Sequence, residues 1–272
     1  MAAAAFSMTM MRILFLGDVV GEPGRKGVIA RLKPLMAERG IDFAVINGEN
    51  AAGGKGITPK ISIDLLRAGA AVITTGDHVW DQADVVPYFA TEPRLLRPLN
   101  YPPGTPGAGS VVLEAEKAKV GVINLQGRTF IQPTLENPFL AVEDEVRRMR
   151  EEEGVRVIVD DFHAEATSEK IAMGWHLDGT VSLVAGSHTH VQTADERILP
   201  GGTAFISDAG MCGPVDSVLG RKWEPVVARF RTSMPARFPV AGGPTMLCGV
   251  VADVDVETGR ATAFERLRET VR

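Results

Sequence analysis

The chain has 272 residues, of which 45% are hydrophobic and 23% charged, and its net charge is -5. Its basic residues are scattered, which argues against long nucleic acid as a partner, because such binding depends on clustered Lys and Arg. No run reaches the roughly 20 apolar residues that a membrane-spanning helix needs, so we expect a soluble protein with no membrane partner. Its two cysteines, Cys212 and Cys248, make no disulfide framework, which favours a cytoplasmic location.

The first ten residues, MAAAAFSMTM, run straight into a strand-like segment. They lack the basic start and the length of a secretory signal. We expect residues 1–10 to be a disordered leader and residues 11–272 to form a single domain.

Short apolar runs then recur along the chain and predict buried strands. They lie at residues 13–16, 43–46, 71–75, 120–125, 155–159, 181–185 and 203–206. Segments with helical periodicity lie between several of them, at residues 27–38, 61–68, 141–152 and 168–175. This alternation indicates an α/β architecture. Residues 246–256 and 262–267 predict a hairpin around Glu257-Thr258-Gly259, and with it a second, more antiparallel sheet.

The most polar, glycine-rich segments come just after the predicted strands. They read GDVVGEPG, NGENAAGGKG, TGDH, DFHAE, GSHTH and SDAGMCG. Ligand sites of open α/β sheets collect beyond the carboxyl ends of the strands. We therefore expect these loops to gather around one site.

Four of the five histidines fall in these loops. His188 and His190 are two residues apart, so in an extended segment their side chains leave the same face and can converge on one point. Two ordinary polar loop residues would give the same pattern, so the pair alone does not establish a metal site.

Acidic and amide side chains occupy matching positions after other strands. Asp18, Glu49, Asn50 and Asp77 each follow an apolar run, and His163 follows another. Together with the histidine pair, they exceed what one four-coordinate ion needs. Such a set suits two divalent ions bridged by a carboxylate and a water, which acidify that water and clamp a phosphoryl group.

The ordered motifs GDVVG, NGEN, GDHVWD, DFHAE and GSHTHVQTAD resemble the YmdB-type branch of the calcineurin-like metallophosphoesterases, from about Met11 to the C-terminus. The resemblance implies a four-layer α/β/β/α sandwich of two mixed sheets. It also implies a di-metal phosphodiesterase acting on small phosphodiesters, with 2′,3′-cyclic nucleotides as a substrate class. The two ions would be iron, although these ligand types suit manganese and zinc as well.

By position, the resemblance assigns the ligands of each ion. One ion would be held by Asp18, Glu49, Asn50 and His190. The other would be held by Glu49, Asp77, His163 and His188, with Glu49 as the bridge. His78 would stand outside the metal ligands and give a proton to the leaving group of a metal-bound hydroxide attack.

Asp77 departs from the family, in which Asn stands at this position. The extra negative charge lowers the positive field at the site and with it the acidity of a bound water. We therefore expect the activity optimum to lie at higher pH than in an Asp77→Asn variant.

The sequence allows more than one role for four further residues. Asp208 either orients a ligand histidine or caps a turn. Arg128 either contacts a phosphate or makes a surface ion pair. His176 belongs to no motif, which favours a packing role, and nothing in the sequence supports Cys212 as a nucleophile.

Two other functions remain as alternatives. A metal-dependent amidohydrolase is disfavoured because its His-x-His pair comes at the first strand of a barrel, whereas here it comes about two-thirds along the chain. The second alternative is a metal-binding regulatory or scaffold protein with weak or lapsed phosphoesterase activity. The sequence leaves the oligomeric state open, a homo-oligomer included.

Overall fold

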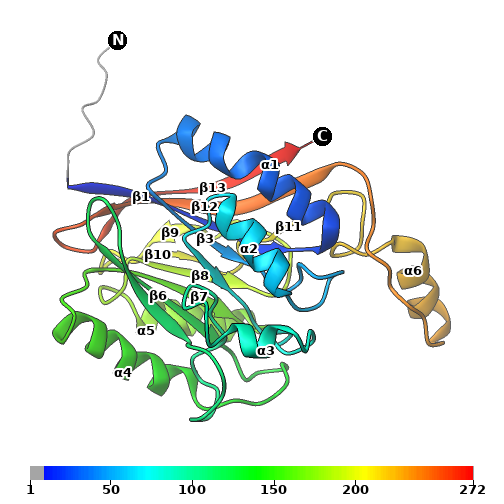
Figure 1. The fold of residues 1–272 in the computed structure, drawn as a ribbon, viewed down its shortest axis with the longest axis horizontal. Helices are drawn as coiled ribbons and strands as arrows, with labels where there is room; N and C mark the ends of the chain where they lie inside the picture. Colours follow the sequence, from blue (N-terminus) through cyan, green and yellow to red (C-terminus); the bar gives the residue numbers. More distant parts are fainter. Residues whose placement is uncertain (1–8, 272) are drawn as a thin grey trace.

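The computed structural model describes residues 9–271, which form two mixed sheets packed face to face between layers of helices (Figure 1). Residues 1–8 of the expected leader lie outside this range, whereas Met10 is the first residue of a strand. The first sheet contains β1 (Met10–Leu16), β2 (Asp18–Val19), β3 (Phe43–Asn47), β4 (Val72–Thr74), β11 (Met211–Pro214), β12 (Thr245–Asp255) and β13 (Ala261–Val271). Its order is β2-β11-β12-β1-β3-β4, with β13 also paired to β12. The strands β1, β3 and β4 run parallel.

The second sheet comes from the middle of the chain. It contains β5 (Ser110–Glu114), β6 (Lys119–Gln126), β7 (Val157–His163), β8 (Leu183–Ser187), β9 (Arg197–Ile198) and β10 (Ala204–Ile206). The order is β5-β6-β7-β8-β10-β9. Its four inner strands are parallel, and the edge strands β5 and β9 are antiparallel to their neighbours.

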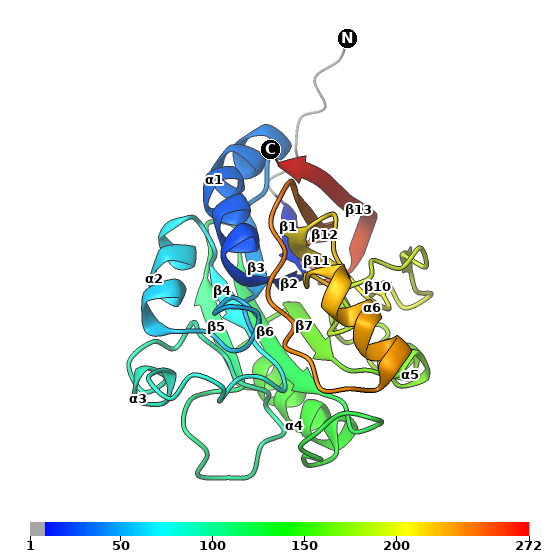
Figure 2. The ribbon, with the colours of Figure 1, turned by 90° about the vertical axis from the view of Figure 1, so that its right-hand side faces the viewer.

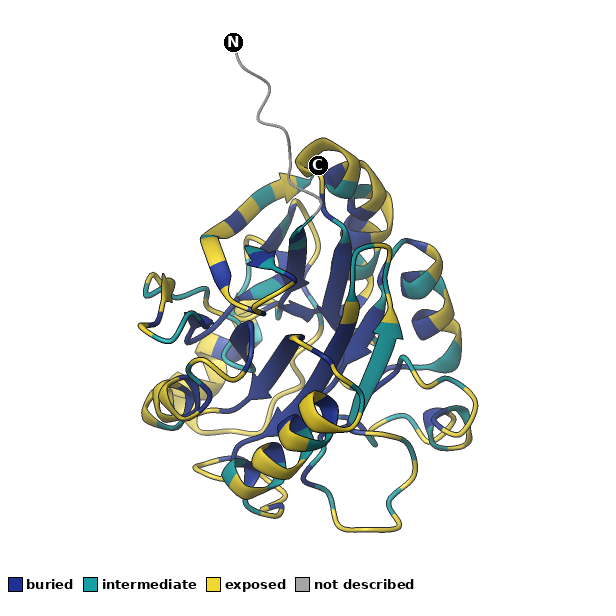
Figure 3. Cartoon of the chain, turned by 90° about the vertical axis from the view of Figure 1, so that its left-hand side faces the viewer, coloured by how far each residue is buried: buried dark blue, intermediate teal, exposed yellow. Residues whose placement is uncertain are grey.

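Helices cover the outer face of each sheet, as Figures 1 and 3 show. The helices α1 (Gly21–Arg39), α2 (Pro59–Arg67) and α3 (Val85–Tyr88) lie on the first sheet, and α4 (Pro138–Glu151) and α5 (Thr167–His176) on the second. A sixth helix, α6 (Trp223–Thr232), projects from the body (Figures 1 and 2).

Side-chain alternation along the strands produces the layers. In β1, Ile13 and Phe15 join the core between the two sheets, whereas Leu14 and Leu16 join the core beneath α1. A third apolar core separates the second sheet from α4 and α5. Because each buried strand supplies two cores, the sheets are sandwiched as predicted. The four-layer α/β/β/α arrangement is confirmed.

Local sequence signals fix where two of the helices begin. The Thr58 hydroxyl accepts a bond from the Ile61 backbone N–H (3.3 Å) at the start of α2. The Asn137 carboxamide oxygen likewise accepts from the Phe139 N–H (3.0 Å) at the start of α4. A proline follows each cap, where its missing N–H costs no helical hydrogen bond.

One expectation about the elements was wrong, and one helix was not predicted. The predicted C-terminal hairpin forms, but its strands β12 and β13 extend the first sheet, and β12 pairs antiparallel with β1 from Met10–Asp255 to Leu16–Gly249. Periodicity predicts a strand without naming its partner, so the hairpin did not indicate a separate sheet. The helix α6 was not predicted, although Trp223, Val226 and Phe230 have helical spacing.

Within residues 9–271, no helix combines the length and the apolar character needed to cross a bilayer.

Candidate metal centre

Four predicted ligands meet where the carboxyl ends of strands from both sheets face each other. Glu49 follows β3, Asp77 follows β4, His163 ends β7 and His188 follows β8. One ligand atom from each lies within 4.8 Å of the others. The His163 Nε2 atom is 3.0 Å from Asp77 Oδ1, 3.2 Å from Glu49 Oε2 and 3.0 Å from His188 Nδ1. Two imidazole nitrogens and two carboxylate oxygens thus surround one point.

The remaining three predicted ligands lie beside this cluster. His190 Nε2 is 3.0 Å from Asn50 Oδ1 and 3.9 Å from Asp18 Oδ1. Asp18 is fully buried, and its Oδ1 has no hydrogen-bond partner among the described residues. An ionised oxygen buried without a partner is costly, and a cation would compensate that cost.

The structure therefore brings together all seven side chains named from the sequence, in two adjoining groups. Carboxylate, amide and imidazole donors are the ligand types that Fe, Mn and Zn share. The cluster of Glu49, Asp77, His163 and His188 could hold a metal ion, and the buried Asp18 oxygen without a hydrogen bond among the described residues fits a cation beside it.

The His-Thr-His segment differs from the expectation in its backbone. Its φ angles are 98° at His188 and 65° at His190, so the segment is not extended. The two rings reach the two adjoining groups and do not share one point. Positive φ values strain residues other than glycine, and such strain persists where surrounding contacts hold it.

Asp208 supplies those contacts. Its Oδ2 accepts hydrogen bonds from the Thr189 N–H (3.0 Å) and hydroxyl (2.7 Å) and from Lys170 Nζ (2.7 Å). Its Oδ1 accepts the Gly210 N–H (2.8 Å). Asp208 therefore binds Thr189, the residue between the two histidines, and caps the turn at Gly210, but its carboxylate has no hydrogen bond to a histidine among the described residues.

Each histidine that the sequence predicts as a ligand has a partner on its other ring nitrogen. His163 Nδ1 lies 2.8 Å from Ser187 Oγ, and that hydroxyl donates to Asp161 Oδ1 (2.6 Å). His188 Nε2 lies 3.1 Å from Glu165 Oε2. Such partners fix the ring orientation and raise ligand basicity.

The third histidine, His190, donates from Nδ1 to the Leu219 carbonyl (3.2 Å). None of these outer partners was predicted from the sequence. Glu165 stands inside the DFHAE motif and Ser187 inside GSHTH, so these two could have been found there. A backbone carbonyl from a distant segment leaves no sequence signal.

The charges of the site depend on one another. Burial raises the pKa of Asp77, but hydrogen bonds from His163 and His188 outweigh it and hold the pKa of this carboxyl well below its usual range. Burial lowers the pKa of His163, yet the negative charges of Glu49 and Asp77 raise it well above its usual value. The carboxylates around His163 thus favour a proton on its ring, and a bound cation would displace that proton, because a ligand nitrogen must be deprotonated.

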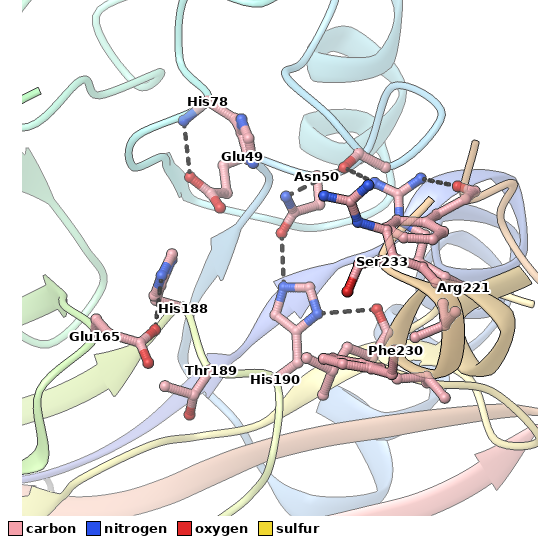
Figure 4. Close-up of a pocket in the computed structure, with 16 residues that line it drawn as sticks. Glu49, Asn50, His78, Glu165, His188, Thr189, His190, Arg221, Phe230 and Ser233 are labelled. Carbon is pink, nitrogen blue, oxygen red and sulfur yellow. Dashed lines mark hydrogen bonds and ion pairs between the residues drawn. The ribbon is translucent and has the colours of Figure 1, made fainter. Parts of the chain in front are cut away.

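His78 lies at the edge of the cluster, on a cavity of about 650 Å³ (Figure 4). Its Nδ1 is 3.1 Å from Asp81 Oδ2, and its Nε2 is 3.8 Å from Asp77 Oδ2. The same cavity is lined by Glu49, Asn50, Glu165, His188 and His190. His78 therefore shares this cavity with four of the predicted metal ligands, Glu49, Asn50, His188 and His190.

Three residues with open interpretations lie away from this cavity. Arg128 is exposed, and its backbone N–H bonds Glu169. His176 ends α5 and packs edge-to-face on Phe139, with 5.3 Å between ring centroids. Cys212 is fully buried, and burial raises its pKa well above the usual value, which disfavours a nucleophilic thiolate.

Comparisons with known proteins agree with the motif resemblance. A family model described as YmdB-like protein matches residues 14–267. A Bacillus subtilis (strain 168) protein named 2′,3′-cyclic-nucleotide 2′-phosphodiesterase is 50% identical over 257 residues, which cover 94% of this chain and 96% of that protein.

Two crystal structures have the same fold over nearly their whole length. A novel phosphatase from Mycoplasma pneumoniae is 36% identical with a TM-score of 0.90, covering 97% of this chain and 95% of its own. A hypothetical protein from Thermus thermophilus is 38% identical with a TM-score of 0.88, covering 96% of this chain and 100% of its own. The chain belongs to the YmdB-like protein family.

Proposed function

We propose that this protein is a metal-dependent phosphodiesterase that hydrolyses small phosphodiesters, with 2′,3′-cyclic nucleotides as its substrate class. The observation that carries the proposal is the cluster of Glu49, Asp77, His163 and His188, whose ligand atoms lie within 4.8 Å of one another. Glu49 and His188 also line the cavity, and Asp18 Oδ1 is buried without a hydrogen bond among the described residues. The name of the Bacillus subtilis relative supports the substrate class.

Two ions, iron first and manganese or zinc as alternatives, would occupy the adjoining groups. Asp18, Asn50 and His190 would hold one, Asp77, His163 and His188 the other, and Glu49 would bridge them. When bound, such ions acidify water and neutralise charge on phosphoryl oxygens. Asp208, Ser187 and Glu165 keep the histidine rings aimed at these positions.

The proton for the leaving group comes from His78. As the water oxygen forms its bond to phosphorus, the bond from phosphorus to the ribose oxygen breaks, and that oxygen needs a proton. The Nδ1 atom of His78 lies 3.1 Å from Asp81 Oδ2, a contact that orients the ring, and His78 lines the cavity in which the leaving oxygen would lie. General acid help of this kind contributes about 10²–10⁴ in rate.

The direct test compares His78→Ala with His176→Ala, a histidine outside the cavity. We expect His78→Ala to lose about 10²–10⁴ of kcat on 2′,3′-cyclic AMP while keeping the metal content of the wild type, and His176→Ala to change neither. Full activity in His78→Ala would remove the donor role.

The proposal as a whole is tested with the wild-type protein. Stripped protein is reloaded with iron, manganese or zinc and assayed on cyclic and linear phosphodiesters. Hydrolysis that depends on metal supports it. Stoichiometric metal without turnover of any diester would favour the regulatory or scaffold alternative, and protein that takes up no metal would refute both.

A further inference from the structure

One wall of the cavity comes from a segment outside the sandwich. Residues 218–238, here called the arm, contain α6 and stand away from the body (Figures 1 and 2). The arm has five basic residues and one acidic residue in a chain whose net charge is negative. Within α6 only Val226 is buried. The arm's exposed large apolar side chains are Leu219, Trp223, Val227, Phe230, Met234 and Phe238.

The cavity joins the arm to the metal ligands. Five of its lining residues are apolar side chains of the arm, namely Val218, Leu219, Val226, Phe230 and Phe238. Figure 4 shows Phe230 and Ser233 on one side of His190, and His188 with Glu165 on the other. The volume of about 650 Å³ lies in the range of small-ligand sites. A ligand seated at the histidines would therefore have room to extend along the arm.

The base of the arm is fixed relative to the ligands. The Arg221 guanidinium donates to the carbonyls of Gly53 (3.1 Å) and Gly54 (2.6 Å), in the loop that follows Glu49. It also donates to a carbonyl within the arm (3.2 Å). The Leu219 carbonyl accepts a hydrogen bond from His190 Nδ1. Arg221 thus positions this wall of the cavity against the loop that follows Glu49.

Phe230 has the chemistry of a stacking surface. It is 84% exposed although it is a large aromatic residue lining a cavity. Exposed apolar groups at a pocket mark binding sites more often than scattered surface residues do. Arg229, also on the cavity, adds a positive charge that attracts an anion.

We propose that the arm binds the nucleobase of the substrate, with Phe230 as the stacking residue and Phe238 completing the apolar wall. This inference rests on the proposed function, since the phosphodiester would lie at the metal ligands and its nucleoside along the arm. An exposed phenyl ring binds a nucleobase by stacking on its flat face. Such stacking tolerates any base, because every base has a π-face. The arm then determines specificity for nucleotides over simple diesters.

The test compares Phe230→Ala with Trp223→Ala. Trp223 is exposed on the same helix but does not line the cavity. Each protein is assayed on 2′,3′-cyclic AMP and on glycerol 1,2-cyclic phosphate, which has no base. We expect Phe230→Ala to raise KM for the nucleotide about tenfold, as loss of one base stack does, with kcat/KM on the base-free diester unchanged. Phe230→Tyr should restore nucleotide affinity, and Trp223→Ala should stay within about twofold of wild type.

Binding of adenosine 3′-monophosphate to metal-stripped protein, followed by calorimetry, gives a readout that needs no turnover. Binding that is weaker in Phe230→Ala but not in Trp223→Ala supports the inference, even if the wild type hydrolyses neither diester. Absence of hydrolysis in the wild type would refute only the proposed function. Equal effects on both diesters, or no effect on nucleotide binding, would overturn it. So would a changed oligomeric mass in Phe230→Ala with an unchanged KM, because the arm would then be a subunit contact.

Discussion

Gly76 lies against two of the proposed metal ligands, His163 and Glu49. A Cβ atom built on Gly76 would approach the ring of His163 and the carboxylate of Glu49 to under 3.0 Å, closer than real Cβ atoms come. Its φ lies outside the left-handed region, so backbone strain does not enter. The Gly76→Ala change therefore acts only by displacing two proposed metal ligands.

The size of the effect follows from the distances. The built atom lies 2.2–2.4 Å from these side chains, so restoring ordinary contacts of about 3.5–4.0 Å requires a shift of roughly 1–2 Å. A misplacement of only about 1 Å already costs about 10² in rate. Overpacking in a buried site costs about 1–3 kcal/mol, so the variant should still fold. We expect a loss of about a hundredfold in kcat/KM together with reduced metal stoichiometry, measured by elemental analysis and initial rates.

Gly242→Ala is the matched control, because a Cβ at Gly242 meets nothing within 4 Å and its φ is also outside the left-handed region. This variant should keep full activity and metal content. A Gly76→Ala protein with wild-type metal content and rates within about twofold would show that the ligands are not held against this glycine, and the reasoning about the centre would fail.

Three more predictions concern single carboxylates. Asp160 is buried with neither oxygen hydrogen-bonded among the described residues, and burial followed by the charge of Asp161 raises its pKa well above the usual value. The folded state keeps this proton at pH values where the unfolded chain has released it. The free energy of unfolding should therefore fall above about pH 4, by up to about 1.4 kcal/mol per pH unit. In urea titrations, Asp160→Asn should lose this part of the dependence of stability on pH, and an unchanged dependence would refute the assignment. In Asp77→Asn, the site carries one negative charge less, so a bound water should be more acidic and the acidic limb of the pH–rate profile, with the optimum, should move to lower pH; superimposable profiles would count against it. Glu165→Gln should weaken metal binding about 10–100-fold through His188, and competition with a chelator that showed wild-type affinity would remove this role.

The loops that form the site could be predicted from the sequence, because their acidic residues and histidines come directly after the apolar runs of the strands. Asp18, Glu49, Asp77 and His163 each follow an apolar run, and parallel strands deliver their carboxyl ends to one edge. Strand partners were not readable, since hydrophobic periodicity is the same whichever neighbour a strand pairs with. The C-terminal hairpin was therefore assigned to the wrong sheet.

The omission of helix α6 from the prediction has a related cause. Its spacing of apolar residues is helical, but Pro225 and the surrounding glycines and prolines weaken the signal. Because most of the helix is exposed, no core requirement shapes it. The backbone geometry of the His-Thr-His segment could not be predicted either. The positive φ values at His188 and His190 depend on the contacts of Asp208 and its neighbours and not on local propensity.

The origin of the ligands explains why this fold suits a two-ion site. All the oxygen donors, Asp18, Glu49, Asn50 and Asp77, follow strands of the first sheet, and all the imidazoles, His163, His188 and His190, come from the second. Neither sheet alone offers a mixed ligand set. The distance between the donor types is thus set by the apolar core between the sheets. Ions bound to both sheets would stabilise their packing by mass action, so metal affinity and the docking of the two sheets are linked in a single equilibrium.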